Sequence, residues 1–363
     1  MSARLIVIGI DARELLGATT GVGRYLGELL SRWTQRPETG SHRFVLYTPE
    51  PLPLELGSAV EQRVLEGDRG TWWEQTTLRS AVDRDAPDVF FAPAYTAPLA
   101  LRMPLAVTIH DVSFSAHPEW FRWREGTRRR WLTRRTARAA RIVFTDSQFS
   151  RREIARHYEI PSARIEVIYP GLTPRATGVA RKRESLVLYA GSIFNRRRLP
   201  DLIAAFAIAL RDFPMARLVI AGDDRTWPPQ DLAAVARDHG VAGRVELRDY
   251  VSDDELASLY ARACVCVFLS EYEGFGLTPL EALAAGVPVV VLDTAVAREV
   301  YGEAAQYVAK GDIAGAAAAI QASLASAEPG ADRVARAPAV LARYSWDVAA
   351  AKTLAGLEGI VAR

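Results

Sequence analysis

The sequence predicts an α/β protein made of two Rossmann-like domains, each a doubly wound parallel sheet, that face a cleft. Its 363 residues are enough for about two domains. Short apolar runs such as 5–10 and 263–269 have the length of strands buried in parallel sheets, and stretches with helical periodicity separate them. This alternation occurs twice, on either side of a charged segment with proline and glycine at 171–184, which we interpret as a linker.

The expected domains are therefore 1–175 and 176–343, followed by a terminal segment at 344–363. In the first domain, strands are predicted at 5–10, 44–47, 88–92, 105–109, 142–145 and 164–168. In the second domain, strands are predicted at 185–189, 217–222, 245–252, 263–269 and 287–292. The alanine-rich stretch 314–327 is predicted to be a surface helix.

Composition narrows the class of protein. Apolar residues make up 49% of the chain, as in globular proteins, and no run is long and apolar enough to span a bilayer. The first apolar run lacks the cationic start and the cleavage site of a signal peptide. Cys264 and Cys266 lie two apart on a predicted strand, so they cannot easily bridge, and free thiols suit the cytosol. We expect a cytoplasmic protein without a metal site, because these cysteines and five scattered histidines show no ligand spacing.

The net charge of +2 is unevenly distributed, with an excess of five positive charges in residues 1–175 and of three negative charges in the remaining chain. Much of the basic excess lies in Trp120–Arg141, where arginines alternate with Trp120, Trp123 and Trp131. One interpretation is contact with an anionic membrane or a lipid pyrophosphate, at the inner face of the membrane, since Trp and Arg suit the bilayer interface. The other is a solvated basic helix with its tryptophans inward. A nucleic-acid partner is not expected, because no known module pattern accompanies the arginines.

The stretch 270–291 contains the most informative pattern. A predicted strand ends at Ser270, and a loop with Glu271, Glu273 and the run Gly274-Phe275-Gly276 follows. Two glycines around one aromatic residue let the backbone approach a ligand closely.

A helix is predicted directly after this loop. Thr278 is the expected N-cap, Pro279 the first helical residue, and Glu281 follows at capping-box spacing. Gly286 and Pro288 end the helix. A glycine-bearing loop that leads into a helix at the carboxyl end of a parallel strand is where anions and nucleotides bind in open α/β sheets.

The segment Glu273–Glu281 resembles the E-x7-E motif of retaining glycosyltransferases with the GT-B architecture, glycosyltransferase family four, and Ala282–Pro288 extends the match. The resemblance covers nearly the whole chain and is densest over 186–308. It implies that Glu273 contacts the hydroxyls of the donor sugar and that Glu281 binds the ribose. It also implies donor contacts for Gly274, Phe275, Gly276, Leu277 and Thr278. The alternatives are a solvated carboxylate for Glu273 and a helix cap alone for Glu281.

Two further loops match the phosphate-binding parts of this family. Gly21 and Gly23 are expected in a loop before a helix, beside the donor pyrophosphate, although a simple turn is the alternative. In the second half, Gly191 is followed by Arg196 and Arg197, which the resemblance assigns to the phosphates.

The three consecutive arginines at 196–198 depart from the family in two positions. Arg197 stands where lysine is usual and Arg198 where asparagine is usual, so the charge is kept but the shape is not. The alternative for these residues is a solvated run of arginines.

The remaining candidate residues also come from the resemblance. His110 lies at a predicted strand tip before Asp111, where the family has a histidine that touches the donor sugar. Tyr250 and Val251 are expected beside the nucleobase, and 344–363 resembles a terminal helix that returns to the first domain.

The predicted function is transfer of a hexosyl unit from a nucleotide-diphosphate sugar, with retention and without a metal. The donor is expected to be GDP- or UDP-linked, with mannosyl favoured because the segment 110–114 is similar to bacterial polysaccharide mannosyl- and rhamnosyltransferases. The acceptor is expected to be a glycan or lipid-linked glycan, and no cofactor is expected. The alternatives are a sugar-nucleotide epimerase of the same architecture, or a non-catalytic two-domain sugar-binding protein.

Overall fold

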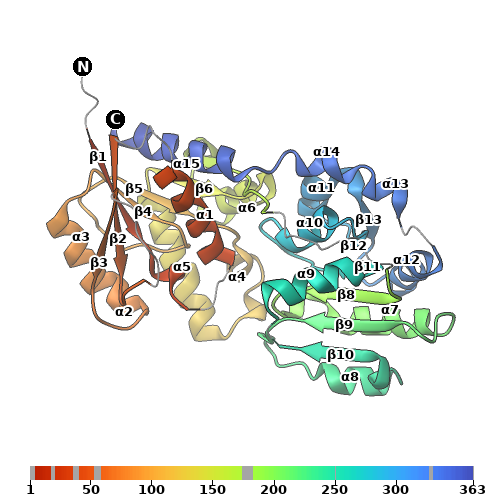
Figure 1. The fold of residues 1–363 in the computed structure, drawn as a ribbon. Coiled ribbons are helices and arrows are strands. Elements are labelled where there is room, and N and C mark those ends of the chain that lie inside the picture. Colours follow the sequence, from red (N-terminus) through yellow and green to blue (C-terminus); the bar gives the residue numbers. More distant parts are fainter. Residues whose placement is uncertain are drawn as a thin grey trace. The chain divides into compact units, whose positions relative to one another are not determined.

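A computed structural model describes residues 5–17, 21–35, 41–52, 59–173, 183–249, 251–326 and 330–362. Its contacts divide the chain into two compact units (Figure 1). The first unit contains residues up to Pro118, residues 123–171 and residues 345–363. The second unit contains residues 119–122 and 172–344.

The first unit is built on a parallel sheet of seven strands, in the order β3-β2-β1-β4-β5-β6-β7 (Figure 1). Its central strands are buried on both faces, which explains why the sequence shows continuous apolar runs instead of alternation. The strands are β1 (Ile6–Asp11), β2 (His42–Thr48), β3 (Val60–Val64), β4 (Val89–Ala92), β5 (Leu105–Thr108), β6 (Ile142–Thr145) and β7 (Ile165–Val167).

Helices cover this first sheet, and the last helix of the chain belongs to the same unit. α15 lies along α1, where the indole nitrogen of Trp33 donates a hydrogen bond of 2.9 Å to the carbonyl of Ala350 (Figure 1). The helices are α1 (Gly21–Gln35), α2 (Thr71–Trp73), α3 (Arg79–Asp85), α4 (Ser113–Ala116), α5 (Trp123–Ala139), α6 (Gln148–Tyr158) and α15 (Trp346–Val361). One π-helical turn, Glu74–Leu78, joins α2 to α3.

The second unit repeats the plan with a six-stranded parallel sheet in the order β10-β9-β8-β11-β12-β13. Its strands are β8 (Leu186–Ala190), β9 (Arg217–Ala221), β10 (Val245–Arg248), β11 (Val265–Phe268), β12 (Val289–Leu292) and β13 (Ala305–Val308). Its helices are α7 (Leu199–Leu210), α8 (Leu232–Asp238), α9 (Asp253–Arg262), α10 (Leu277–Ala284), α11 (Ala295–Tyr301), α12 (Ile313–Ala325), α13 (Ala331–Val334) and α14 (Ala337–Leu341). The fold class predicted from the sequence, two parallel-sheet α/β domains, is confirmed.

Several local predictions are wrong. The strand β3 was not predicted, because an edge strand carries polar residues that hide the apolar pattern. Gly21 and Gly23 lie in the first turn of α1, not in a loop before it. The N-cap of α10 is Gly276 instead of Thr278, which is already helical. The predicted surface helix at 314–327 is present as α12, which buries one face against α7 and leaves the other accessible.

The remaining sequence expectations for these regions have mixed outcomes. The predicted linker falls largely on 174–182, outside the described residues. Cys264 and Cys266 are buried free thiols, as expected. In the described part of the chain, every helix is too short or too polar to cross a bilayer.

Candidate functional site

The loop that joins β11 to α10 is shaped by Gly276. This residue has φ +91°, and a Cβ built on it would lie 2.1 Å from the hydroxyl oxygen of Tyr301. That hydroxyl donates a hydrogen bond of 2.9 Å to the carbonyl oxygen of Gly276. Only glycine therefore fits this position, which opens the helix and directs its first amides toward the carboxyl edge of the sheet.

Glu273 is held in this loop through one of its two carboxylate oxygens. Oε1 accepts a hydrogen bond of 2.7 Å from the Ser270 hydroxyl and one of 3.0 Å from Nε of Arg197. Within the described residues, Oε2 accepts none. Burial disfavours the charged carboxylate, but the charges of Arg197 and Arg196 outweigh it, so the pKa of Glu273 lies below its ordinary value. The residue is therefore a fixed carboxylate with one available oxygen.

Arg197 connects the ends of two neighbouring strands of the second sheet, β8 and β11. Besides Glu273, its guanidinium donates hydrogen bonds to the Ser192 carbonyl at 2.8 Å and to the Tyr189 hydroxyl at 3.2 Å. It also lies over the ring of Phe268, 4.8 Å from the ring centre. The arginine is thus rigidly placed, with its charge partly neutralised by Glu273.

Gly191 allows a close approach between the loop that carries Arg197 and the first turn of α10. It has φ +113°, and a Cβ there would lie 2.8 Å from Nη1 of Arg197 and 3.4 Å from Oγ1 of Thr278. The structure therefore gathers Gly191, Arg197, Thr278 and Glu273, all predicted from the sequence, at one edge of the second sheet.

Arg196 differs from its neighbour because it forms no ion pair among the described residues. The residue is only 9% exposed, and its guanidinium stacks 4.1 Å from the ring centre of Phe194. Its Nε is buried without a hydrogen-bond partner among the described residues, and no ion pair involves this arginine there. A largely buried guanidinium that forms no ion pair can accept a further negative charge beside it, so this arrangement is suited to an anionic ligand.

The backbone conformation of Arg198 suits the asparagine that is usual at this position in the family. The residue has φ +50°, in the left-handed region that asparagine adopts more easily than other non-glycine residues. Its guanidinium pairs with Asp201 at 2.6 Å and with Glu271 at 2.5 Å, and Glu271 also pairs with Lys310. Because these two ion pairs balance its charge, Arg198 is not available to a ligand beside Arg196 and Arg197.

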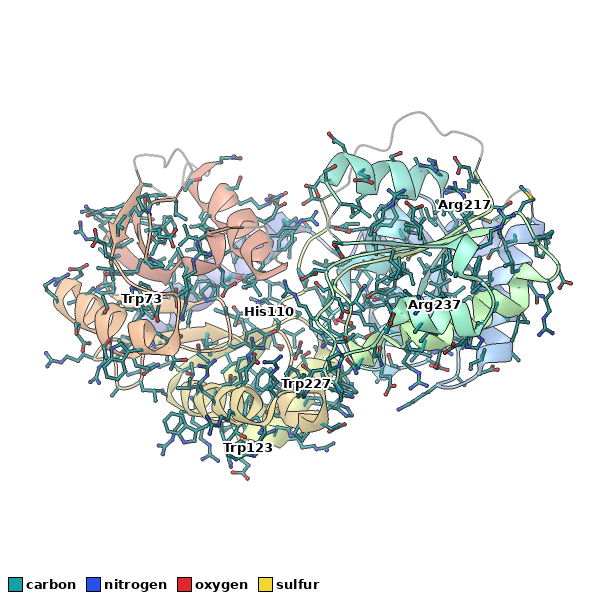
Figure 2. All side chains as sticks on the ribbon, turned by 90° about the horizontal axis from the view of Figure 1, so that it is seen from below. Trp73, His110, Trp123, Arg217, Trp227 and Arg237 are labelled. Atoms are coloured by element: carbon teal, nitrogen blue, oxygen red, sulfur yellow. The ribbon has the colours of Figure 1, made fainter. Side chains whose placement is uncertain are left out.

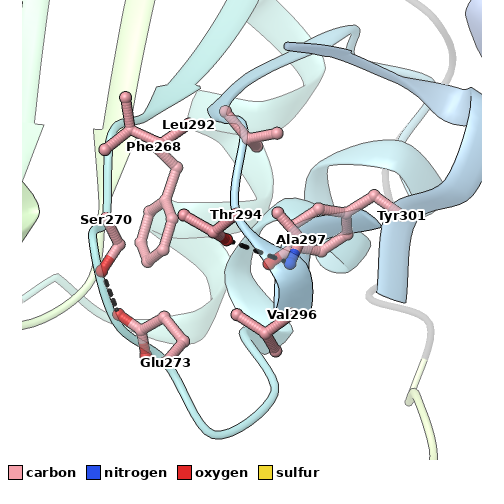
Figure 3. A pocket seen from close by; sticks show the side chains of 9 residues that line it. Phe268, Ser270, Glu273, Leu292, Thr294, Val296, Ala297 and Tyr301 are labelled. Atoms are coloured by element: carbon pink, nitrogen blue, oxygen red, sulfur yellow. Dashed lines mark hydrogen bonds between the residues drawn. The ribbon is translucent and has the colours of Figure 1, made fainter. Parts of the chain in front are cut away.

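A small cavity of about 10 Å³, room for about one water molecule, lies beside Glu273 (Figure 3). Figure 3 shows the carboxylate of Glu273 hydrogen-bonded to Ser270 on one side of this space, with Tyr301 across it. Its lining residues are Phe268, Ser270, Glu273, Val291, Leu292, Thr294, Val296, Ala297 and Tyr301. The aromatic and aliphatic wall limits the directions that the carboxylate can take.

The other predicted donor residues have varied surroundings. Glu281 is partly buried in α10, and the Tyr260 hydroxyl donates to it at 3.5 Å, a long hydrogen bond. Phe275 is buried and packs its ring edge-to-face against Tyr344 at 5.0 Å, which makes it a core residue. Gly274 is buried as well, whereas Leu277 and Val251 are partly exposed, and Tyr250 lies outside the described residues.

His110 lies in the first unit, at the carboxyl end of β5 (Figure 2). Its Nδ1 is 2.7 Å from a carboxylate oxygen of Asp146, and its Nε2 is 3.0 Å from the carbonyl oxygen of Pro93. Burial disfavours the imidazolium, but Asp146 and the Pro93 carbonyl favour it, so the pKa of His110 is raised. Because both ring nitrogens have protein partners, neither is available to a ligand in this arrangement.

A second buried polar cluster of the first unit was not predicted from the sequence. Arg13, which follows β1, pairs with Asp11 at 2.7 Å and also with Glu74. Glu74 in turn accepts a hydrogen bond of 2.6 Å from the Thr96 hydroxyl. Burial raises the pKa of Asp11 to about 6. The cluster ties the loops after β1 and β4 together, and no local sequence pattern marks it, because its members are about sixty and twenty residues apart.

Two parallel-sheet units with a charged loop at the carboxyl edge of the second sheet are the architecture of glycosyltransferases of the GT-B type, and the family models assign the chain to that class. The family model "Glycosyltransferase Family 4" matches residues 19–175, and the model "Glycosyl transferases group 1" matches residues 184–326. The chain belongs to glycosyltransferase family four.

Curated relatives agree with this assignment. The chain is 28% identical to O-antigen chain mannosyltransferase B of Escherichia coli over 320 residues, which cover 84% of this chain and 80% of the relative. It is 26% identical to the MMP alpha-(1->4)-mannosyltransferase of Mycolicibacterium hassiacum over 359 residues, which cover 93% and 79% of the two chains.

Two solved glycosyltransferase-like folds align over nearly the full length. WaaG, a glycosyltransferase involved in lipopolysaccharide biosynthesis, has a TM-score of 0.75 at 16% identity and covers 98% of this chain and all of its own. HepE of Anabaena, in complex with UDP and glucose, has a TM-score of 0.74 at 18% identity with the same coverage. At these sequence identities, the likeness to the two solved structures shows the fold alone.

In the described residues, no group of three or more His, Cys, Asp or Glu side chains is placed to hold a metal ion.

Proposed function

We propose that the protein transfers a hexosyl unit, with mannosyl favoured, from a nucleotide-diphosphate sugar to a glycan or lipid-linked glycan, with retention of the anomeric configuration. The observation that carries this proposal is the largely buried Arg196, which forms no ion pair and whose Nε has no hydrogen-bond partner among the described residues, beside the half-occupied carboxylate of Glu273. A diphosphate supplies the negative charge that Arg196 lacks, and a sugar supplies hydroxyl donors for the available oxygen of Glu273.

The departing nucleoside diphosphate carries the charge that develops in the transition state. Arg196, held against Phe194 and short of a counter-ion, stabilises that charge without having to reorganise. Arg197 assists from its fixed place beside Glu273, and the first amides of α10 add donors at the same edge. In other enzymes a metal cation can stabilise a departing diphosphate. Because the two arginines and the helix amides can supply this stabilisation, we propose activity without a metal.

Glu273 orients the sugar in this proposal. Its Oε1 is occupied by Ser270 and Arg197, so the carboxylate cannot rotate freely, and Oε2 accepts hydrogen bonds from the sugar hydroxyls. Glu281, further along α10, binds the ribose. In retention without a protein nucleophile, the departing phosphate oxygen takes the proton of the acceptor hydroxyl as the new glycosidic bond forms on the same face.

The donor and acceptor classes are supported by the names of the relatives. The two relatives quoted above are named as mannosyltransferases, which favours a mannosyl donor and therefore GDP-mannose. UDP stays the alternative, because the HepE structure contains UDP and glucose. The term O-antigen chain in one relative's name favours a polysaccharide acceptor. The epimerase and sugar-binding alternatives have no comparable support among these relatives.

We also propose that α5 contacts an anionic membrane surface at the cytoplasmic side. Trp123 (Figure 2) is 76% exposed and Trp131 is 52% exposed. The inward orientation that the sequence allowed for these two tryptophans is therefore wrong. Arg124 and Arg128 are exposed on the same helix and have no ion pair in the described structure. Exposed indoles among unpaired arginines suit the interface of a bilayer with acidic lipids.

Three measurements test the proposed function. Thermal-shift assays with GDP and UDP, free and sugar-linked, are expected to show stabilisation by one base in preference to the other. Turnover of the preferred donor in the presence of a chelator tests the metal independence. The anomeric configuration of the product, read by NMR coupling constants, is expected to match that of the donor. Absence of nucleotide binding in wild-type protein, or an inverted product, would overturn the corresponding part of the proposal.

A further inference from the structure

The residue Tyr95 stands out in the first unit because its backbone adopts a conformation that a tyrosine disfavours. It has φ +60°, in the left-handed region where a bulky side chain is an outlier. Tyr95 lies three residues after β4, a central strand of the sheet, at the carboxyl edge. Backbone outliers persist where the surrounding structure enforces them, and they concentrate at functional sites.

The segment 93–97 is fixed on both sides of Tyr95. The Pro93 carbonyl accepts from His110 at 3.0 Å, and the amide of Tyr95 itself donates to the Thr108 carbonyl at 2.9 Å. On the other side, the Thr96 hydroxyl donates to Glu74 at 2.6 Å. The buried His110–Asp146 pair and the buried Arg13–Glu74 pair thus hold this loop from two directions.

The side chain of Tyr95 is neither core nor fully exposed. Its ring meets the rings of His110 and Phe114 at 5.7 Å and 5.8 Å between centres, at angles of 71° and 73°, and the residue stays partly accessible. A glycine or asparagine would adopt the same φ with less strain, so the aromatic ring is the property that distinguishes tyrosine at this position.

We propose that Tyr95 is an aromatic platform on which a sugar ring of the acceptor lies. A pyranose has one face of C–H groups that packs on an aromatic ring, while its hydroxyls remain free for polar partners. His110 then acts through Tyr95: with both nitrogens engaged, the imidazole supports the ring and its loop instead of contacting the carbohydrate itself. This inference rests on the proposed glycosyl transfer.

The test uses the full chain and three variants. Saturation-transfer NMR records binding of methyl α-D-mannoside, methyl α-L-rhamnoside and methyl β-D-galactoside. Tyr95→Asn relieves the backbone and removes the ring, and we expect it to weaken glycoside binding about tenfold or more. Its melting temperature should stay within about 4 °C of wild type, because lost ring contacts and relieved strain offset each other. Tyr95→Phe, which keeps the ring, should retain binding.

The matched control is Ala86→Gly. Ala86 also has a positive φ, of +46°, but it caps α3 before β4 begins, at the amino edge of the sheet. This variant should raise the melting temperature by about 2–4 °C and leave glycoside binding unchanged. Equal glycoside signals in wild type and Tyr95→Asn, including no signal in either, would overturn the inference. Failure of wild type to bind GDP and UDP would instead overturn the proposed function, so the two failures are distinguishable.

Discussion

Arg197 and Glu273 form an ion pair of 3.0 Å in which both side chains are largely buried, with exposed fractions of 12% and 14%. The preceding residue, Arg196, is equally buried but has no such partner among the described residues. Two adjacent arginines therefore have opposite electrostatic situations. The charge of Arg197 is balanced by an ion pair within the protein, whereas Arg196 forms no ion pair among the described residues.

This difference predicts that alanine substitution of Arg197 mainly lowers stability, whereas alanine substitution of Arg196 mainly lowers turnover. Arg197→Ala leaves the Glu273 carboxylate buried without its partner, so the free energy of unfolding should fall by about 3–5 kcal/mol. Arg196→Ala breaks no ion pair, so stability should fall less than in Arg197→Ala, while turnover should drop about 10²- to 10³-fold through the lost stabilisation of the leaving group.

Urea unfolding and kcat, measured on the same preparations, separate the two effects. The control is Arg217→Ala, which removes an exposed arginine paired with Glu184 and should change stability by less than about 1 kcal/mol. Full turnover in Arg196→Ala would contradict the assignment of the anion site to this residue.

The hydrogen bond from Ser270 to Glu273 predicts a positioning role for a residue that does not need to touch the substrate. Ser270→Ala removes a donor to a charged carboxylate, and such bonds contribute about 1.5–3 kcal/mol. We expect kcat to fall by roughly 10- to 100-fold, because Glu273 would sample other directions.

Ser323→Ala is the matched control for Ser270→Ala. It removes a buried hydroxyl that donates to the Ala319 carbonyl within α12, away from the proposed site. Equal losses of kcat in both serine variants would show that the effect is a general loss of stability. An unchanged kcat in Ser270→Ala would mean that Arg197 alone orients the carboxylate.

The charge state of His110 predicts a pH dependence of stability. One ring nitrogen faces a backbone carbonyl and the other faces Asp146, so the pair holds one proton more than a neutral imidazole beside a carboxylate. The groups that face the imidazole are Asp146, Asp111, Tyr25 and Tyr95. Because the pKa of His110 is raised on folding, its contribution is fully present below the unfolded value and is lost as the pH rises through the folded value.

Unfolding free energies of wild type and His110→Gln, measured from pH 6 to pH 9, test this sign. The difference between the two proteins should shrink toward alkaline pH, by about 1.4 kcal/mol for each unit of the pKa shift. Parallel profiles would indicate a neutral imidazole. Two imidazole N–H signals in the NMR spectrum at neutral pH would support the protonated pair independently.

The sequence was sufficient for the parts of the fold and site that local patterns specify. Buried parallel strands have continuous apolar runs, and Gly-Phe-Gly before a helix marks a close approach, so the sheets and the Glu273 loop could be predicted. The cap of α10 could not, because the conformation of Gly276 depends on Tyr301, 25 residues away. Thr278 looked like a cap only because its local spacing fits the capping box.

The supporting contacts of the site were missed for the same reason. Ser270 stood in the predicted stretch, but its role follows from a carboxylate orientation that spacing does not encode. In the sequence, Tyr189 and Phe194 resemble ordinary core residues. Their contacts with Arg197 and Arg196 become visible only in the fold. Tyr95 carried no signal at all, because a tyrosine is not a residue from which a left-handed backbone is expected.

The exposed face of α5 predicts binding to acidic lipid vesicles. Wild-type protein should sediment with phosphatidylglycerol vesicles and not with phosphatidylcholine vesicles, and high salt should release it, because screening weakens the attraction between arginines and headgroups. The double variant Trp123→Ala, Trp131→Ala should lose most of this binding by removing the two exposed indoles. The double variant Arg124→Ala, Arg128→Ala should weaken it about 30-fold, at about 1 kcal/mol for each arginine.

Trp72→Ala is the matched control for the vesicle experiment. Trp72 is 78% exposed in the same unit, but it lies on α2, whose short sequence Thr-Trp-Trp carries no arginine. If exposed tryptophan alone caused sedimentation, Trp72→Ala would reduce binding as much as the α5 variants do. We expect binding to phosphatidylglycerol vesicles alone, and we expect only the α5 variants to lose it. This result would show that the indoles and arginines of α5 act together. Equal sedimentation of all variants, or tighter binding to single-stranded nucleic acid than to vesicles, would contradict the membrane assignment.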